Sequence, residues 1–236
     1  MNIYIETYGC QMNVADSELV ASILKGDKFS VVEDIAEADI IIFNTCSVRQ
    51  HAEDRVMGRI NNEMSRKKQK KNLKIGVIGC MAQRLDKELN KMNSNIDFVV
   101  GVDQYKKLPE IITDLFDDAD FKCNTTVDDN EIYKDIYPIH NGEFNAFVTI
   151  MRGCNNFCSY CIVPYTRGRE RSRPVDDILN EIDRIGEKGF KDVTLLGQNV
   201  NSYNYKNVNF AELLKRVNKI ESIKRIRFVT SHPKDL

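Results

Sequence analysis

The chain has 236 residues, with 34 Lys and Arg against 35 Asp and Glu, so its formal net charge is close to zero. That length allows one large domain or two smaller ones. The charge balance excludes a protein that binds nucleic acid through an overall positive charge, although a local basic patch could still do so. No apolar run approaches the ~20 residues of a membrane span, and the N-terminus lacks a secretory signal. We therefore expect a cytoplasmic protein without membrane association, whose seven cysteines stay reduced.

Apolar runs alternate with helical patterns through the first half of the chain. Strands are predicted at 2–7, 31–32, 38–43, 73–78 and 98–100. Helices are predicted from a cap at 16–17 up to Gly26, from Val48 to Lys68, at 83–91 and at 104–116. This alternation is typical of a parallel sheet covered by helices, so the fold class is α/β. We assign residues 1–118 to an N-terminal domain and the polar stretch 119–143 to a linker.

Three cysteines that are distant in sequence each follow a predicted strand: Cys10, Cys46 and Cys80. Because the carboxyl ends of parallel strands share one edge of the sheet, these cysteines are predicted to converge there. Glycine precedes two of them, which suits a tight turn around a bulky cofactor. The alternative is that each is a small buried residue. Three cysteines in equivalent positions favour a metal site.

Two other features of this half receive simpler interpretations. Cys123 lies in the polar stretch and is assigned no role. The basic run 66–71 is typical of a solvated helix end, and a contact with RNA phosphates is the alternative.

The second half begins with a predicted strand at 144–151, followed by cysteines in the spacing C-x3-C-x2-C, namely Cys154, Cys158 and Cys161. Three thiolates in so short a loop can hold three irons of a cubane 4Fe–4S cluster and leave the fourth iron open for a substrate. Ferredoxin-like carriers close that position with a fourth cysteine, which is absent here. A three-ligand zinc site is the alternative. The tight loop after an apolar strand, without a histidine nearby in sequence, favours iron–sulfur.

The remaining chain has the pattern of repeated βα units. Arginines occupy every second position from 167 to 173, and an extended backbone would place all four on one side, where they could bind phosphates or carboxylates. A solvated loop is the alternative. A helix is predicted from Pro174 to Gly189, strands at 192–196 and 225–229, and a helix around 210–217. We interpret His232, which follows the last strand, as a loop residue, and a place in the site is the alternative.

Polar residues at the ends of these strands are typical of a barrel that acts at its C-terminal face. Three parallel strands cannot close a barrel. Residues 144–236 are therefore expected to be the first part of one, and the chain to be a fragment of a longer protein.

Several runs resemble the methylthiotransferase family of radical S-adenosylmethionine enzymes. They are Glu6-Thr7-Tyr8-Gly9-Cys10-Gln11-Met12-Asn13, Asn44-Thr45-Cys46-Ser47-Val48-Arg49, Gly79-Cys80-Met81-Ala82-Gln83-Arg84 and the stretch 146–174 with the cysteine loop. The resemblance covers nearly the whole chain and is weakest at 106–143. It implies an open parallel-sheet methylthiotransferase domain followed by an incomplete radical S-adenosylmethionine barrel, without the family's C-terminal TRAM domain.

The resemblance also implies the cofactors and their ligands. Cys154, Cys158 and Cys161 would hold a catalytic 4Fe–4S cluster whose open iron binds S-adenosylmethionine. A second 4Fe–4S cluster would be held by Cys10, Cys46 and Cys80. By position, the contacts to S-adenosylmethionine would be Tyr160, Gly197, Gln198 and Asn199.

The implied activity is the conversion of N6-isopentenyladenosine next to the tRNA anticodon to its 2-methylthio derivative, with a second S-adenosylmethionine supplying the methyl group. The implied partners are a tRNA carrying isopentenyladenosine and an electron donor such as flavodoxin, and the chain is expected to be a monomer. Related enzymes act on threonylcarbamoyladenosine in tRNA or on an aspartate of a ribosomal protein. The runs 153–156 and 168–171 favour the isopentenyladenosine branch by resemblance. The alternative of another class is a non-catalytic metal-binding or RNA-binding module.

Overall fold

The computed structural model describes residues 1–25, 28–47, 50–91, 95–117, 120–140, 142 and 144–235, without the side chains of 50–52. The chain forms two compact units, Met1–Asp128 and Asp129–Leu236. The predicted helix end at Gly26, the predicted helix start at Val48 and the predicted domain limits at 118, 119 and 143 lie outside the described residues.

The first unit is built on a parallel sheet. In the described part of the chain its strand order is β2-β1-β3-β4-β5-β6. The strands are β1 (Asn2–Tyr8), β2 (Ser30–Val31), β3 (Ile40–Thr45), β4 (Lys74–Gly79), β5 (Phe98–Val100) and β6 (Lys122–Asn124). Strand β3 is buried along its whole length, as its nearly unbroken apolar sequence requires in a parallel sheet. The strand order reverses between β1 and β3, so a ligand site is expected beyond their carboxyl ends.

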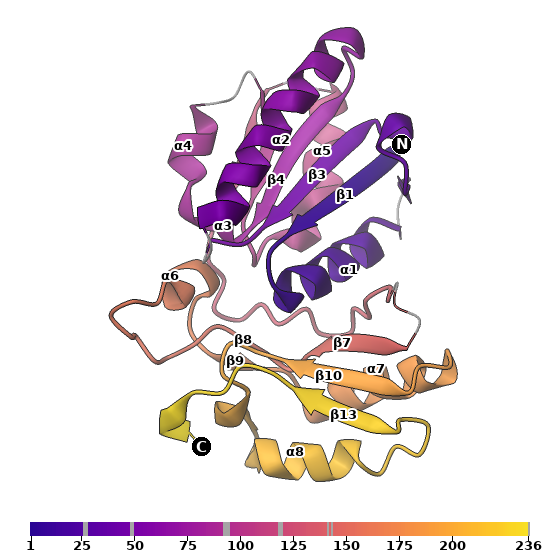
Figure 1. Ribbon diagram of the computed structural model, residues 1–236, viewed down its shortest axis with the longest axis vertical. Coiled ribbons are helices and arrows are strands. Elements are labelled where there is room, and N and C mark those ends of the chain that lie inside the picture. The colour runs from indigo at the N-terminus through magenta and orange to yellow at the C-terminus, as the bar shows by residue number, and fades with distance from the viewer. Residues whose placement is uncertain are drawn as a thin grey trace. The chain divides into compact units, whose positions relative to one another are not determined.

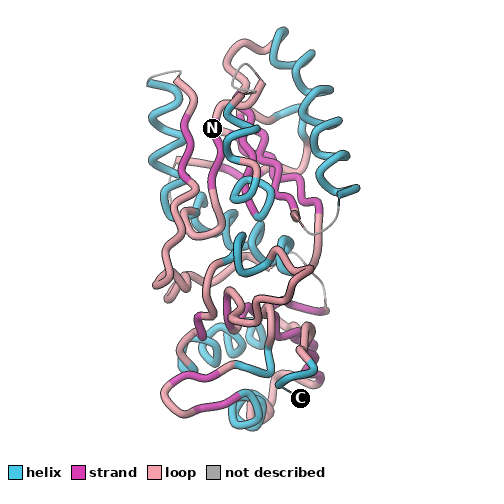
Figure 2. Tube along the Cα trace, turned by 90° about the vertical axis from the view of Figure 1, so that its left-hand side faces the viewer, coloured by secondary structure: helices cyan, strands magenta, loops and turns pink. Residues whose placement is uncertain are grey.

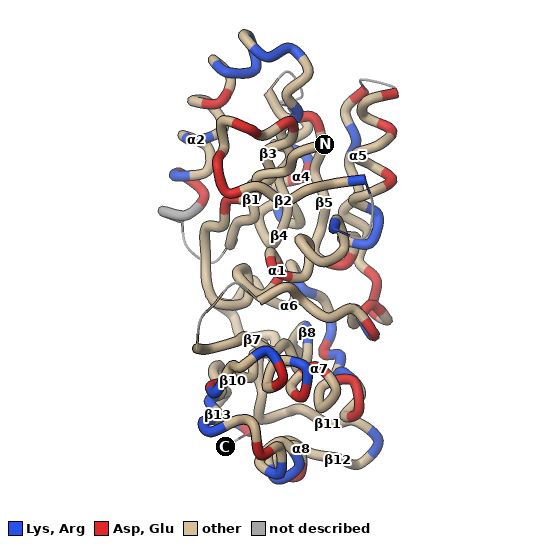
Figure 3. Tube along the Cα trace, turned by 90° about the vertical axis from the view of Figure 1, so that its right-hand side faces the viewer, with Lys and Arg blue, Asp and Glu red and all other residues tan. Residues whose placement is uncertain are grey.

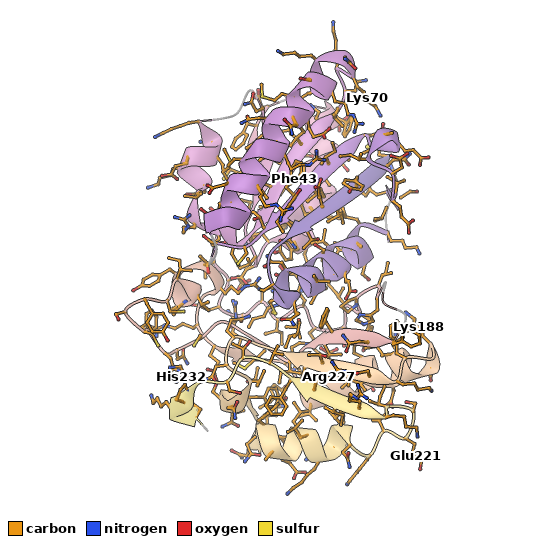
Figure 4. The ribbon with its side chains drawn as sticks, viewed as in Figure 1. Phe43, Lys70, Lys188, Glu221, Arg227 and His232 are labelled. Atoms are coloured by element: carbon orange, nitrogen blue, oxygen red, sulfur yellow. The ribbon has the colours of Figure 1, made fainter. Side chains whose placement is uncertain are left out.

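Helices cover both faces of this sheet. They are α1 (Gln11–Lys25), η1 (Ile35–Glu37), α2 (Gln50–Gln69), α3 (Cys80–Arg84), α4 (Asp86–Asn90), η2 (Tyr105–Lys107) and α5 (Leu108–Asp117). Helix α2 crosses the front of the sheet and α5 lies behind it (Figure 1). Val56 and Ile60 of α2 belong to the same apolar cluster as Phe43, which lies on the sheet beneath that helix (Figure 4).

Three elements of the first unit differ from the sequence prediction. Helix α1 begins at Gln11 rather than at 16–17, and Asp16 is fully buried inside it, where the Tyr105 hydroxyl donates to its carboxylate. The helix predicted at 83–91 is two short helices that meet at Leu85. Strand β6 lies within the stretch predicted to be a linker, because its backbone pairs with β5. From there to β7 the described chain is loop (Figure 2).

The second unit contains a parallel sheet in the order β13-β10-β7, with helices α7 and α8 (Figure 1). Its elements are β7 (Asn145–Thr149), β8 (Met151–Arg152), α6 (Val163–Arg167), β9 (Arg171–Ser172), α7 (Val175–Glu187), β10 (Asp192–Leu196), η3 (Val200–Ser202), β11 (Asn204–Tyr205), β12 (Val208–Asn209), α8 (Phe210–Val217), β13 (Arg225–Phe228) and η4 (Pro233–Asp235). Strand β10 is buried throughout, whereas β13 is largely exposed. The fold matches the first βα units of a barrel.

The arginine series does not form one extended row. Arg167 ends helix α6, Arg171 lies in β9, and both are buried together with Arg173. Arg169 alone among the four is exposed. Helix α7 begins at Val175, with Pro174 as its N-cap rather than its first residue.

Arg173 is the centre of a buried ion cluster. Its guanidinium donates to Asp177 at 2.7 Å, to Glu181 at 2.7 Å and to the Thr149 carbonyl at 2.7 Å. The three charged side chains are at most 5 % exposed. Burial raises the pKa of Glu181, and the charge of Arg173 opposes that rise. This arginine therefore joins β7 to α7 and is not available to a phosphate.

Replacing Arg173 by Leu is expected to lower the free energy of unfolding by about 3–5 kcal/mol, because two buried carboxylates lose their counter-charge. Urea denaturation followed by circular dichroism measures the change. The matched control is Arg216→Ala, which breaks an exposed ion pair with Glu212 and should cost no more than about 0.5 kcal/mol. Equal effects of the two substitutions would contradict the structural role of Arg173.

Candidate metal centres

The register of the first sheet brings three cysteines to one edge. Tyr8 of β1 pairs with Thr45 of β3, and Thr45 pairs with Gly79 of β4, so these three residues form one row across the sheet. Cys46 and Cys80 directly follow Thr45 and Gly79, and Cys10 lies two residues beyond Tyr8. The amide of Cys46 donates to the Tyr8 carbonyl at 2.9 Å. The three cysteines therefore lie just beyond the same row of paired residues at the end of the sheet.

Glycines let these cysteine turns approach one another. A Cβ atom on Gly9 would stand 2.8 Å from Cβ of Cys46, so the Cys10 turn lies directly against Cys46. Gly79 has φ +93°, and a Cβ there would contact the Asn44 side chain and stand 2.8 Å from the Thr45 carbonyl oxygen. Side chains at these two positions would force the turns apart.

Two buried asparagines fasten the Cys10 turn to the end of β3. Asn13 Nδ2 donates to Asn44 Oδ1 at 3.2 Å, and Asn44 Nδ2 donates to the Asn13 carbonyl at 2.8 Å and to Ser17 Oγ at 2.9 Å. The Asn13 side-chain oxygen lies 3.3 Å from the backbone N of Cys10 and 3.4 Å from its Sγ. Both asparagines are fully buried. Their amide groups therefore fix where the Cys10 thiol stands.

The second group of cysteines lies in the loop that follows β7 and β8. Strands β8 and β9 pair antiparallel, and beyond them the amide of Cys154 donates to the Gly168 carbonyl at 3.2 Å. Gly153 has φ +75°, and a Cβ there would strike the Arg169 carbonyl. Within the loop, the Cys161 amide donates to the Cys158 carbonyl at 2.9 Å. The loop is thus closed on itself and anchored at its start.

The Cys154 thiol lies in a different environment from the other two loop thiols. Cys154 is buried, whereas Cys158 and Cys161 are partly exposed. Burial raises the pKa of the Cys154 thiol, Cys158 and Cys161 act in the same direction, and the N–H of Asn156, 3.4 Å from the sulfur, opposes the rise. A positive metal centre would reverse this balance by stabilising the thiolates.

The residues predicted to bind S-adenosylmethionine fall in two groups. Gln198 and Asn199 are tied into the site: the Gly153 amide donates to the Gln198 side-chain oxygen at 2.6 Å, and buried Asn199 donates to Asp235 at 2.6 Å. Gly197 lies against Met151, since a Cβ there would stand 2.5 Å from that side chain. Tyr160 extends into solvent with 86 % of its surface exposed.

Sequence reasoning missed the contribution of the last described residues. His232 Nε2 lies 3.4 Å from Cys158 Sγ, and Asp235 accepts from Asn156 of the cysteine loop at 3.3 Å. Figure 4 places His232 in the stretch beyond β13. His232 is a loop residue, as interpreted from the sequence, and this contact also brings it next to the cysteine loop, which was the alternative. The only sequence signal was its position after a strand, because the contact joins residues far apart in the chain.

The two groups of thiols differ from a preformed site for a single ion. Among the residues that the structure describes, no three His, Cys, Asp or Glu side chains gather closely enough to chelate one metal ion. A zinc ion needs its sulfur ligands within about 2.3 Å of one point. An iron–sulfur cubane is larger and keeps its thiolate ligands farther apart. Thiolates are the ligands of such clusters, so the chemistry of each group of three thiols suits one.

The basic run near the end of α2 is seen as blue segments of the trace (Figure 3), and its Arg66, Lys67 and Lys70 form ion pairs with acidic side chains. Lys67 lies 2.6 Å from Asp97, and Lys70 lies 2.8 Å from Asp39. These contacts support the interpretation as a charged helix end rather than as an RNA-binding patch.

Comparison with known proteins relates both halves of the chain to described families. Residues 2–101 match the Uncharacterized protein family UPF0004, and residues 148–235 match the Radical SAM superfamily. The chain is 52% identical over 240 residues to the tRNA-2-methylthio-N(6)-dimethylallyladenosine synthase of Parabacteroides distasonis and 50% identical over 241 residues to that of Bacteroides thetaiotaomicron. Relatives about half identical over nearly the whole chain thus carry this name, and the chain contains both a UPF0004 and a radical SAM domain. It spans about half the length of these relatives, since each match covers 99% of the chain and 52% of the relative.

Solved structures support the fold of the chain. The radical S-adenosylmethionine methyltransferase TsrM from Kitasatospora setae, with tryptophan and an S-adenosylmethionine analogue bound, aligns with a TM-score of 0.59 at 12% identity, over 92% of the chain and 51% of TsrM. A second structure of TsrM, with cobalamin and a 4Fe–4S cluster, aligns with a TM-score of 0.53 at 12% identity, over 85% of the chain and 49% of TsrM. The mixed α/β architecture with parallel sheets is thereby confirmed, and the family implies 4Fe–4S clusters and S-adenosylmethionine as cofactors. Within the described residues, no helix is both long and apolar enough to cross a membrane.

Gly79→Ala is expected to lower the free energy of unfolding of the metal-free protein by about 1–3 kcal/mol, because the residue has positive φ and its Cβ would contact Asn44. Displacement of Cys80 should also lower the iron content of the anaerobically reconstituted protein. Urea denaturation and iron analysis measure the two effects.

The matched control is Gly58→Ala, in the exposed middle of α2, where an added Cβ meets no atom within 4 Å. It should raise stability by up to about 1 kcal/mol through helix propensity and leave the iron content unchanged. If both variants gain stability and keep full iron, the close approach at Gly79 does not constrain the site.

Proposed function

We propose that the protein to which this chain belongs converts N6-isopentenyladenosine next to the tRNA anticodon to its 2-methylthio derivative. The observation that carries the proposal is the presence of two separate groups of three thiols at strand ends: the row-aligned Cys10, Cys46 and Cys80, and the loop cysteines. The names of the relatives, tRNA-2-methylthio-N(6)-dimethylallyladenosine synthase, support the substrate.

Cys154, Cys158 and Cys161 would hold the catalytic 4Fe–4S cluster. When bound, that cluster supplies one electron to S-adenosylmethionine and so generates the radical that activates C2 of the adenine. The chain's own residues position the cysteine loop and the segments around the cluster. The Gly153–Gln198 hydrogen bond sets the start of the cysteine loop, while Asn199 and Asp235 hold the neighbouring strand-end segments. Gly197 and Tyr160 complete the contacts that we propose for S-adenosylmethionine.

Cys10, Cys46 and Cys80 would hold the second cluster, which takes part in sulfur insertion. Here the chain's contribution is position: the sheet register sets the level of the three thiols, and Asn13 and Asn44 fix the Cys10 turn. We further propose that the protein acts in the cytoplasm as a monomer on tRNA and receives its electrons from a donor such as flavodoxin.

Selective loss of each group of cysteines tests these roles in the full-length protein. Anaerobic reconstitution should give about eight irons per chain. Replacing Cys154, Cys158 and Cys161 together by Ala should leave about four irons and abolish formation of 5′-deoxyadenosine from S-adenosylmethionine and reductant. Replacing Cys10, Cys46 and Cys80 by Ala should also leave about four irons but preserve formation of 5′-deoxyadenosine.

Zinc in place of iron would instead favour a metal-binding module, and full iron in either triple variant would contradict the assignment of those cysteines as cluster ligands. An unmodified wild-type preparation, handled in parallel, controls for incomplete reconstitution.

Nucleoside analysis of tRNA tests the substrate. Cells that lack the full-length gene should lose 2-methylthio-N6-isopentenyladenosine and accumulate N6-isopentenyladenosine. Loss of the methylthio form of threonylcarbamoyladenosine, with the isopentenyl series intact, would assign the protein to the other tRNA branch. Restoration by the wild-type gene, but not by the Cys154→Ala gene, is the control.

A further inference from the structure

An exposed group of two aromatic rings and one guanidinium, which we call the aromatic surface, lies at the cysteine loop. The rings of Phe157 and Tyr165 meet edge to face with centroids 5.8 Å apart. The guanidinium carbon of Arg169 stands 4.4 Å from the centre of the Phe157 ring. Phe157 is 46% exposed and Tyr165 is 67% exposed. Two exposed rings in contact with each other form a patch on which a partner can dock.

The charge of Arg169 narrows the kind of partner. In the part of the chain that the structure describes, Arg169 forms a cation–π contact with Phe157 and no ion pair with a carboxylate. Its neighbours Arg171 and Arg173 are buried, so Arg169 alone in this series offers its charge to solvent. A partner that covers this surface must therefore supply both flat apolar faces and negative charge.

The aromatic surface is attached to the proposed cluster site. Phe157 stands between Cys154 and Cys158 in the loop. Tyr165 lies on α6, which follows Cys161, and the backbone of Arg169 packs against Gly153. A molecule bound here would lie beside the reacting groups, and its position would be fixed by the same loop that holds the thiols.

We propose that Phe157, Tyr165 and Arg169 bind unpaired RNA nucleotides next to the adenosine that reacts. Bases stack on aromatic rings whatever their sequence, and a guanidinium suits a phosphate. Single-stranded RNA supplies both groups in alternation, whereas an apolar protein segment would bury the charge of Arg169 without a counter-charge. This inference rests on the proposed function, because it takes tRNA to be the substrate, and it assigns the contacts that position the anticodon loop.

RNA binding by full-length, reconstituted protein tests the inference. The probe is a fluorescent anticodon stem–loop that carries isopentenyladenosine, and anisotropy gives its Kd. Tyr165→Leu and Phe157→Leu should each raise Kd roughly tenfold, the size expected for loss of one base stack. Arg169→Ala should raise Kd and lower the slope of log Kd against log salt by about 0.7–0.9, as expected for one lost phosphate contact.

Matched controls separate this surface from general effects. Phe144→Leu replaces an exposed ring of the same unit, and Arg216→Ala removes an exposed guanidinium. Both should leave Kd and its salt slope unchanged. Iron content and 5′-deoxyadenosine formation without RNA should match wild type in Tyr165→Leu and Arg169→Ala, which shows that the cluster site has assembled.

The outcomes distinguish this inference from the proposed function. Unchanged Kd in Tyr165→Leu and Arg169→Ala overturns the inference, as does a fall in their melting temperature with Kd unchanged, since the rest of the full-length chain would then cover the surface. Equal losses in the controls overturn it too. If wild type binds the stem–loop through these residues but forms no methylthio product, the inference stands and the proposed function fails.

Discussion

The arrangement of the first unit depends on backbone pairing in register across β1, β3 and β4. The row Tyr8–Thr45–Gly79 is fixed by hydrogen bonds along the full length of three strands, and the cysteines follow that row directly. A shift of one residue in β3 would exchange the side chains that pack on its two buried faces, so close packing of the core favours the observed register. The position of the thiols is therefore a consequence of how the hydrophobic core packs.

The cysteine loop of the second unit is positioned in a different way. Its three thiols come from one short loop, so local sequence brings them together and long-range contacts fix the loop as a whole. Gly153, Gln198 and Asn199 join it to the segments after β8 and β10, while His232 and Asp235 approach from beyond β13. The first site thus depends on sheet register, and the second on hydrogen bonds among strand-end loops. Sheet-edge ligand sites of α/β folds commonly combine a rigid sheet with such loops.

Sequence was sufficient for features that follow from periodicity or short spacing. The apolar runs gave β3, β4, β5 and β10, and the strand-end positions of Cys10, Cys46 and Cys80 pointed to one edge. Sequence was insufficient where the structure depends on a contact with a residue far away in the chain. Asp16 resembles a helix cap, yet it lies inside α1 because buried Tyr105 supplies its hydrogen bond. Likewise, the arginines from 167 to 173 occupy every second position, but this period does not place them on one side. Arg173 pairs with buried Asp177 and Glu181, and Arg167 is part of helix α6.

That division of the arginines explains how one short segment can serve structure and binding together. Burying a guanidinium is favourable only where carboxylates and carbonyls satisfy it, as they do for Arg173. The segment from 168 to 172 is consequently held tightly against the cysteine loop by β8–β9 pairing. Arg169 lies in the middle of that fixed segment, so its exposed charge has a defined position, and among the residues that the structure describes no carboxylate pairs with it. A rigid backbone that presents this charge beside two aromatic rings loses little conformational freedom on binding, and this favours a role in recognition over that of a solvated loop.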